Sequence, residues 1–286
     1  MRIGELQVAI RVEAEIGEGP VFDSRTGQMC WVDLANGYHF QSDLARGVER
    51  RWSLGTVLGA AAPRANQPGF AVAVAEGFGL VVDGVLDVVD PVLPASNTRM
   101  NDAKCDPLGR MWAGSTTLDF VPGRGALHRW DGVSPSTLMY ENLTLPNGLG
   151  WNAEANTMYL ADSKAGTVMN ANFDLEHGEI GEFRPLATID SGVPDGLAVD
   201  MDGCLWVAAW GGSAIHRFDH AGRLMLTIDM PVSQPSSCAF APDGTLYVTS
   251  ARAGLDAATL RAEPLAGSVF RIATGTRGVP VAAFGA

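Results

Sequence analysis

Asp200-Met-Asp-Gly-Cys-Leu-Trp206 reads as a turn followed by a strand that carries one aromatic residue, and this unit returns along the chain. Further copies are Asp23–Trp31, Asp106–Trp112, Asn152–Tyr159 and Ala241–Tyr247, with a weaker copy at Gln67–Phe70. The steps between successive aromatic residues are 39, 42, 47, 47 and 41, for Trp31, Phe70, Trp112, Tyr159, Trp206 and Tyr247. A period of roughly 40–45 residues built from short strands is typical of a β-propeller blade. The repeat therefore predicts an all-β, six-bladed β-propeller.

All six copies are assigned to a single domain that spans residues 1–286. A length of 286 residues would by itself suggest two domains of about 150 residues each. Consecutive blades, however, bury their faces against each other and close into one ring. The 34 glycines and 16 prolines suit many tight turns, and no stretch keeps a 3.6-residue hydrophobic period, so we expect little helix. A propeller gathers residues from distant parts of the chain around its central channel.

The composition narrows the class of partner. A net charge of −12 argues against nucleic acid and anionic membrane as partners. Residues 1–11 lack the apolar core of a signal peptide, and no apolar run approaches the roughly 18 residues that cross a bilayer. The four cysteines have no Cys-x-x-Cys spacing and are expected to be buried free thiols, at Cys30, Cys105, Cys204 and Cys238. These features predict a cytoplasmic protein, and its acidity alone does not reveal a partner.

Several common chemistries have no matching motif. The chain lacks Gly-x-Ser-x-Gly, His-Glu-x-x-His, Gly-x-x-x-x-Gly-Lys and Gly-x-Gly-x-x-Gly. His216 and His220 have the spacing of a helical zinc pair, but their segment reads as a strand followed by a turn. On a strand, residues four apart lie too far from each other to bind one ion. We therefore expect these histidines to be structural or exposed.

A set of polar residues precedes the blade aromatics at a nearly constant distance. The pairs are Glu18 and Trp31 (13 residues apart), Asn101 and Trp112 (11), Asn147 and Tyr159 (12), and Asp195 and Trp206 (11). Equal phase in a repeat means an equal place in the blade, so these four residues should face one another around the channel. At this phase the other two blades have Ser236-Ser237 and the apolar stretch 56–59. A polar residue at this phase in only some of the blades is typical of a binding or catalytic site.

The chemistry of this set indicates a cation. Glu18 and Asp195 would repel each other in a narrow channel unless a proton or a cation lay between them. With the amide oxygen of Asn147 they form a set of hard ligands suited to calcium, magnesium or manganese, and zinc is less favoured. The alternative is that Glu18-Gly, Asn147-Gly and Asp195-Gly are turns, where these residues are favoured for backbone reasons alone. Asp102 should point to the opposite face and be structural, and Asp162 ends a strand where it could brace the channel.

These segments, in this order, resemble the family of regucalcin (the senescence marker protein), gluconolactonases and the luciferin-regenerating enzyme. The resemblance runs from Gly17 to Arg252, and its most specific stretches are Arg99–Gly114 and Pro194–Gly212. It implies a six-bladed propeller with one divalent cation held by Glu18, Asn147 and Asp195. Ca²⁺ is the first expectation for this cation, and Zn²⁺, Mg²⁺ or Mn²⁺ are alternatives.

The resemblance also implies a substrate and a reaction. Arg99 and Asn101 would hold the hydroxyls of a sugar lactone, and Asp119, the only acid in the short loop 115–124, would be a further contact. The expected activity is metal-dependent hydrolysis of an aldonolactone, gluconolactone-like or a pentonolactone, with Asp195 as general base. Two alternatives stay open: another metal-dependent hydrolase of the diisopropylfluorophosphatase type, and a calcium-binding propeller without activity. The oligomeric state is not predicted.

Overall fold

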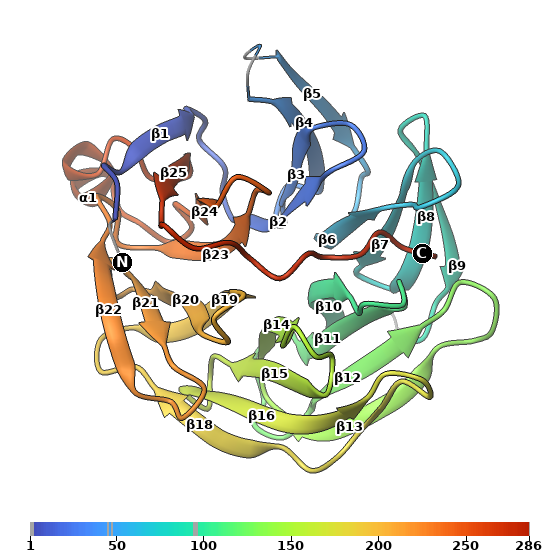
Figure 1. Ribbon diagram of the computed structural model, residues 1–286. Coiled ribbons are helices and arrows are strands. Elements are labelled where there is room, and N and C mark those ends of the chain that lie inside the picture. Colours follow the sequence, from blue (N-terminus) through green and yellow to red (C-terminus); the bar gives the residue numbers. More distant parts are fainter. Residues whose placement is uncertain (1–2, 45, 47, 94–96, 286) are drawn as a thin grey trace.

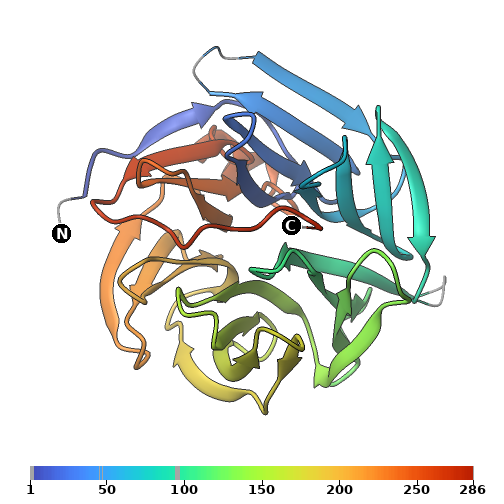
Figure 2. The ribbon, with the colours of Figure 1, turned by 45° about the vertical axis from the view of Figure 1, so that its right-hand side comes forward.

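Six small antiparallel sheets surround a central channel in the computed structural model, which describes residues 3–44, 46, 48–93 and 97–285 (Figure 1). Each sheet is one blade, and Figure 2 shows the same ring from another side. The prediction of an all-β, six-bladed β-propeller is confirmed. In the described part of the chain, the one helix is α1 (Ala257–Ala262).

In blades 1 to 5 the strands follow the chain from the channel outward. Blade 1 contains β2 (Gly17–Asp23), β3 (Gln28–Asp33), β4 (Tyr38–Asp43) and β5 (Val48–Ser53). Blade 2 contains β6 (Leu58–Pro63), β7 (Phe70–Val74), β8 (Gly77–Val82) and β9 (Val85–Asp90). Blade 3 contains β10 (Thr98–Cys105), β11 (Met111–Thr117), β12 (Gly125–Trp130) and β13 (Thr137–Leu143).

The second half of the ring follows the same pattern with one addition. Blade 4 contains β14 (Pro146–Trp151), β15 (Thr157–Asp162), β16 (Thr167–Asp174) and β18 (Arg184–Thr188), and the short β17 (Glu179–Ile180) also pairs with β16. Blade 5 contains β19 (Val193–Val199), β20 (Leu205–Trp210), β21 (Ala214–Phe218) and β22 (Leu224–Asp229). Blade 6 contains β23 (Pro235–Phe240), β24 (Thr245–Ser250), β25 (Val269–Ala273) and, outermost, β1 (Gln7–Ile10).

The repeated turn and its aromatic residue form one hydrogen-bonded unit. Every repeat aromatic lies buried on the second strand of its blade. The indole Nε1 of Trp112 donates to Asp106 Oδ2 at 2.9 Å, and that of Trp206 donates to Asp200 Oδ2 at 2.8 Å. Both carboxylates are fully buried, so they need such partners. This bond explains why an aspartate stands six residues before the tryptophan in these two copies.

The core is divided among the blade interfaces. Six buried hydrophobic clusters are present, one between each pair of neighbouring blades. Trp206 of blade 5, for example, packs in one cluster with Leu246 of blade 6. All four cysteines are buried and free, as predicted. None of the helices in the described residues has the length and apolar character needed to cross a membrane.

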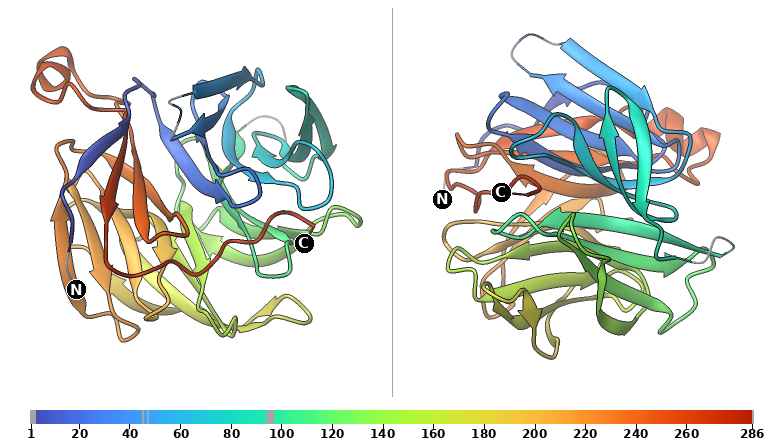
Figure 3. Two further views of the ribbon diagram at one scale, coloured as in Figure 1. Left: turned by 45° about the horizontal axis from the view of Figure 1, so that its top comes forward. Right: turned by 90° about the vertical axis from the view of Figure 1, so that its right-hand side faces the viewer.

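Both ends of the described chain are built into the ring. Strand β1 pairs with β25, with Gln7 opposite Arg271, so residues far apart in sequence complete blade 6. The segment after β25 then crosses the channel axis from blade 5 to blades 2 and 3 (Figures 1 and 3). Along it, Val279 N donates to Val199 O at 2.9 Å, and Phe284 N donates to Pro63 O at 2.8 Å. The Phe284 ring stacks on Trp130 with centroids 4.9 Å apart.

Candidate metal and substrate site

A cavity of about 210 Å³ lies at the channel, at the opposite end of the innermost strands from the segment that contains Val279. Four innermost strands, β2, β10, β14 and β19, contribute to it. Five of the predicted site residues meet there: Glu18, Arg99, Asn101, Asn147 and Asp195. The remaining lining residues are Ile16, Leu34, Phe120, Leu145, Ser163, Lys164, Val193 and Trp210.

Local irregularities of the innermost strands coincide with the site residues. The register of β2 shifts between Glu18 and Val21, that of β14 between Pro146 and Leu149, and that of β19 between Pro194 and Leu197. A β-bulge interrupts the alternation of side chains and re-aims one of them. Glu18, Asn147 and Asp195 each lie at such a shift, on the strand that faces the channel.

The glycines after Asn147 and Asp195 serve close packing between blades. A Cβ atom on Gly148 would lie 2.4 Å from Leu197 N, and one on Gly196 would lie 2.0 Å from Ser237 Oγ. Neither glycine has a left-handed backbone. Asn147-Gly and Asp195-Gly are therefore parts of β14 and β19, and the interpretation of these two pairs as turns is wrong. The absent side chains let neighbouring innermost strands approach each other.

Two oxygen atoms in the cavity lack hydrogen-bond partners. Asn147 Nδ2 donates to Ser163 Oγ at 3.1 Å, and Ser163 Oγ donates to Pro194 O at 2.6 Å, which fixes the amide. Asn147 Oδ1 and Asp195 Oδ1 are buried without a partner among the described residues. Buried polar atoms are rarely left in that state in proteins. These atoms point to something that the protein binds.

The donor set fits a divalent cation. Glu18, whose Oε2 accepts from Gly19 N at 3.1 Å, adds a second carboxylate to the two orphaned oxygens. Carboxylate and amide oxygens are the ligands that Ca²⁺ and other hard cations prefer. In the described ranges, no three His, Cys, Asp or Glu side chains gather as a metal site. Two carboxylates and one amide oxygen would thus hold the ion and leave coordination positions open.

Burial and neighbouring carboxylates disfavour the negative charge of Glu18 and Asp195. Burial, and then the nearby Asp102, raise the pKa of Glu18 to about 8, while Arg99 opposes the shift. Burial, Glu18 and Asp102 raise the pKa of Asp195 well above its ordinary value. Without a cation, the site therefore retains protons that a bound cation would displace.

Asp102 contributes to this environment, which the sequence did not indicate. The register of β10 shifts between Met100 and Ala103, so simple alternation does not apply at this residue. Asp102 is buried, and its carboxylate raises the pKa of both Glu18 and Asp195. Burial raises the pKa of Asp102 itself, and Lys104, whose Nζ donates to Leu197 O at 2.7 Å, lowers it.

We expect the metal-free protein to become less stable as the pH rises from 5 to 8. The pKa of Glu18 is about 8 in the folded protein and 4.5 as the ordinary value of the unfolded chain. Between these values the folded state holds a proton that the unfolded state lacks, so this contribution is complete below pH 4.5 and is lost as the pH passes through 8. The slope is at most about 1.4 kcal/mol per pH unit for one proton.

Urea unfolding in chelator at a series of pH values measures this slope. Glu18→Gln is the control, because an amide cannot titrate, and it should flatten the part of the slope that belongs to Glu18. A wild-type stability that rises over this range, or a slope that Glu18→Gln leaves unchanged, would contradict the assignment.

Arg99 and Asn101 form a connected pair in the cavity wall. Arg99 Nη1 donates to Asn101 Oδ1 at 2.6 Å and to Met100 O at 3.0 Å. Asn101 Nδ2 donates to Pro146 O at 3.0 Å, across to the neighbouring blade. Asn101 thus positions the guanidinium of Arg99, whose positive charge lies near both Glu18 and Asp195. Their contacts with a substrate remain predictions.

The predicted contact Asp119 lies outside the cavity lining. Its side chain is exposed, and its Oδ1 accepts from Asn97 Nδ2 at 3.4 Å. The next residue, Phe120, lines the cavity instead. A role for Asp119 in substrate binding therefore stays a prediction that no contact in the cavity supports.

Sequence reasoning missed residues at or just after the end of the second strand of three blades. Leu34, Lys164 and Trp210 line the cavity and come three to five positions after the repeat aromatics Trp31, Tyr159 and Trp206. They could have been found by comparing the positions just after each repeat aromatic in the same way as the positions before it. For Phe120, whose loop has no counterpart in the repeat, no such signal exists.

Aspartates at the ends of second strands brace the entry to the innermost strands. Asp162 accepts hydrogen bonds from Thr144 N at 2.8 Å and from Leu145 N at 3.0 Å, just before Asn147. Asp33 accepts from Ile16 N at 3.1 Å in the same way, just before Glu18. The expectation that Asp162 braces the channel is confirmed.

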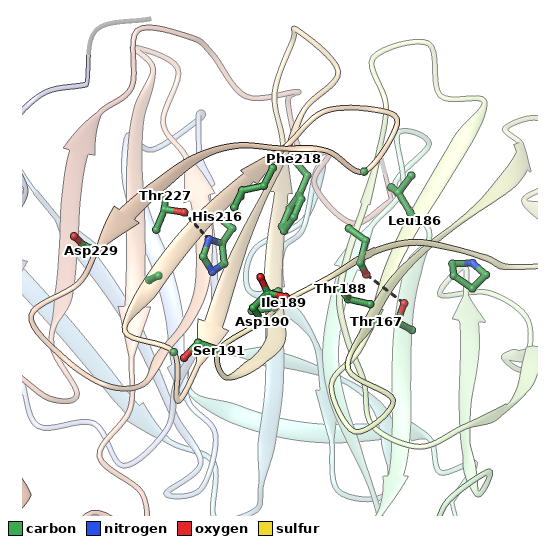
Figure 4. A pocket seen from close by; sticks show the side chains of 16 residues that line it. Thr167, Leu186, Thr188, Ile189, Asp190, Ser191, His216, Phe218, Thr227 and Asp229 are labelled. Atoms are coloured by element: carbon green, nitrogen blue, oxygen red, sulfur yellow. Dashed lines mark hydrogen bonds between the residues drawn. The ribbon is translucent and has the colours of Figure 1, made fainter.

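A larger cavity lies away from the channel. Figure 4 shows this space of about 540 Å³ between blades 4 and 5, lined by residues of β18, β21 and β22. His216 Nδ1 lies 3.0 Å from Thr227 Oγ1, and Thr167 Oγ1 donates to Ala187 O at 3.3 Å. The orphaned oxygens lie in the channel, and we therefore place the candidate site there. His220 is exposed and joins no metal cluster of the described residues.

Comparisons with known proteins agree with this architecture. The family model described as the SMP-30/gluconolactonase/LRE-like region matches residues 16–252. Regucalcin of Danio rerio is 30% identical, over 96% of this chain and 97% of that protein. A Bacillus subtilis protein named as a candidate sugar lactone lactonase, YvrE, is 29% identical over 90% of each chain. The crystal structure of regucalcin from Agrobacterium tumefaciens, a calcium-binding protein, has a TM-score of 0.90 at 26% identity and covers 98% of this chain and 97% of that one.

Proposed function

Because the chain belongs to the SMP-30/gluconolactonase/LRE-like family, we propose that it is a divalent-metal-dependent lactonase that hydrolyses a sugar lactone to its acid. One observation carries the proposal. Asn147 Oδ1 and Asp195 Oδ1 are buried without hydrogen-bond partners among the described residues, in a cavity that also contains the Glu18 carboxylate and the Arg99 guanidinium. Such a cavity offers oxygen ligands on one side and a cationic donor on the other.

Glu18, Asn147 and Asp195 would hold the cation, with Ca²⁺ as the first expectation because of the oxygen-only donors. When bound, the cation supplies Lewis-acid chemistry, since it withdraws electron density from the lactone carbonyl and stabilises the charge that develops there. Arg99 donates hydrogen bonds to the sugar hydroxyls, and Asn101 keeps the guanidinium in place through the 2.6 Å contact. The apolar side chains of Leu34 and Trp210, which line the cavity, exclude bulk water from the bound lactone ring.

Asp195 acts as the general base in this proposal. Its carboxylate takes one proton from a water molecule while the water oxygen bonds to the carbonyl carbon. The bond between that carbon and the ring oxygen then breaks, and the ring oxygen receives the proton. Burial raises the pKa of Asp195 in the metal-free site, and a bound cation would lower it, so the loaded site would hold the deprotonated carboxylate that accepts this proton. The products are the acid and one new hydroxyl group.

Lactone hydrolysis tests the proposal directly. Sugar γ- and δ-lactones would be assayed near neutral pH with protein stripped by chelator, and again after Ca²⁺, Mg²⁺, Mn²⁺ or Zn²⁺ is restored. We expect turnover that is lost on stripping and recovered with at least one ion. Tight ion binding without turnover of any lactone would overturn the proposal. In that case a phosphoester substrate or a calcium-binding role would explain the site.

A further inference from the structure

A lysine and a phenylalanine are paired at the cavity. Lys164 follows β15, and its Nζ lies 4.8 Å from the centroid of the Phe120 ring, in cation–π contact. Both residues line the cavity, and Lys164 is exposed to solvent, which places it at the mouth. In the described ranges, the ion pairs do not include Lys164. Among the described residues, a lysine without an ion-pair partner therefore lies at the entrance of the cavity.

The backbone that presents Phe120 is in an unusual conformation. Phe120 has a φ of 54°, in the left-handed region that aromatic residues rarely adopt. Hydrogen bonds from Phe120 N to Thr117 O at 3.0 Å and from Val121 N to Thr117 Oγ1 at 2.8 Å hold the loop. Gly123 N also donates to Thr144 Oγ1 at 3.3 Å. Residues kept in such conformations cluster at ligand sites, where the surrounding structure enforces them.

The distribution of charge singles out Lys164. The chain has a net charge of −12, and of its 20 basic residues only Lys104 and Lys164 are lysines. Both lie along the channel: Lys104 lines the cavity at the end crossed by the Val279 segment, and Lys164 lines the site. A divalent cation would balance Glu18 and Asp195, and Lys104 acts on Asp102. Arg99 lies near Glu18 and Asp195, whereas Lys164 has no ion-pair partner among the described residues and is the cation that an anionic group of a ligand would meet at the mouth.

Resting on the proposed lactonase function, we propose that the substrate is a sugar lactone with a second, ionised carboxylate, an aldarolactone, and that Lys164 binds this carboxylate. The lactone group would lie at Glu18, Asn147 and Asp195, and the distal carboxylate would meet the ammonium at the mouth. An ordinary aldonolactone has a neutral hydroxymethyl group at that position. It would bring no anionic partner to the ammonium of Lys164.

A matched pair of substrates tests this inference. A hexaldarolactone and the corresponding hexonolactone differ by a carboxylate in place of the hydroxymethyl group. The wild type with Ca²⁺ should prefer the aldarolactone by about tenfold in kcat/KM, as for one hydrogen bond to a charged group. Lys164→Met should bring this ratio close to one, mainly through KM, and Lys164→Arg should retain most of it. Added salt should reduce the wild-type preference.

Arg124→Met is the matched control, because it removes an exposed cation that belongs to the loop containing Phe120 but lies outside the cavity lining. It should leave the ratio between the two substrates unchanged. A wild type that prefers the hexonolactone, or a ratio that Lys164→Met does not change, would overturn the inference.

Binding of the product acids separates this inference from the proposed function. Calorimetry would compare aldarate with aldonate in metal-free protein, because diacids chelate Ca²⁺. Tighter binding of aldarate that Lys164→Met abolishes supports the role of Lys164 even if no lactone is hydrolysed, a result that would overturn the lactonase alone. Equal binding of the two acids would overturn the role of Lys164.

Discussion

Asp195→Asn is expected to lower kcat by at least about a thousandfold and to leave the propeller folded. The amide keeps the shape of the side chain but can neither accept a proton from water nor bring a negative charge to the cation. In the metal-free protein the same change removes a buried carboxyl group whose Oδ1 has no partner. The free energy of unfolding of metal-free Asp195→Asn should therefore equal or exceed that of the wild type.

Steady-state hydrolysis at saturating metal, together with urea unfolding in chelator, measures both effects. Asp243→Asn makes the same chemical change in an exposed turn and should keep wild-type activity. Near wild-type turnover from well-folded Asp195→Asn would exclude this residue as the base. A large loss of stability would instead show that its carboxylate has a structural role.

Glu18→Gln is expected to weaken metal binding by at least about a hundredfold, because it removes one of only two charged ligands. Activity at limiting Ca²⁺ should fall in proportion and should recover when Ca²⁺ is raised. This recovery distinguishes Glu18, which would only hold the ion, from Asp195, which would also act as the base and whose loss added metal should not repair. Glu18 has no second function in the proposed reaction.

Thermal unfolding at increasing Ca²⁺ gives the affinity without reference to turnover, since an ion that binds only the folded state raises Tm in a concentration-dependent way. The wild-type curve should rise at much lower Ca²⁺ than the Glu18→Gln curve. Superimposable curves would show that the ion does not bind through Glu18.

The fold and the centre of the site could be predicted because both follow from phase in a repeat. The spacing of Trp31, Phe70, Trp112 and the later aromatics is set by one structural unit, so counting it reveals six blades. Glu18, Asn101, Asn147 and Asp195 meet because equal phase places them on the innermost strands. The repeating blade therefore explains both the spacing in the sequence and the meeting of these residues in the structure.

The rest depends on departures from regularity. The influence of Asp102 on the pKa of Glu18 and Asp195 could not be predicted, because the register shift of β10 breaks the simple alternation of side chains. The glycines after Asn147 and Asp195 suggested turns, whereas contacts with neighbouring strands explain them. Phe120 depends on a left-handed backbone fixed by Thr117 and Thr144, which no single-sequence pattern indicates. Asp119 was chosen as the only acid in its loop, but the loop presents the next residue to the cavity.

The segment that contains Val279 and Phe284 determines from which end of the channel small molecules enter and leave. Because it lies across one end of the channel, the site is reached from the end where Phe120 and Lys164 lie. In the proposed lactonase, the lactone enters and the acid leaves through the same entrance. The product must therefore dissociate before the next substrate molecule can bind. The acid then acts as a competitor for its own precursor. Accumulation of the acid should therefore slow the proposed hydrolysis.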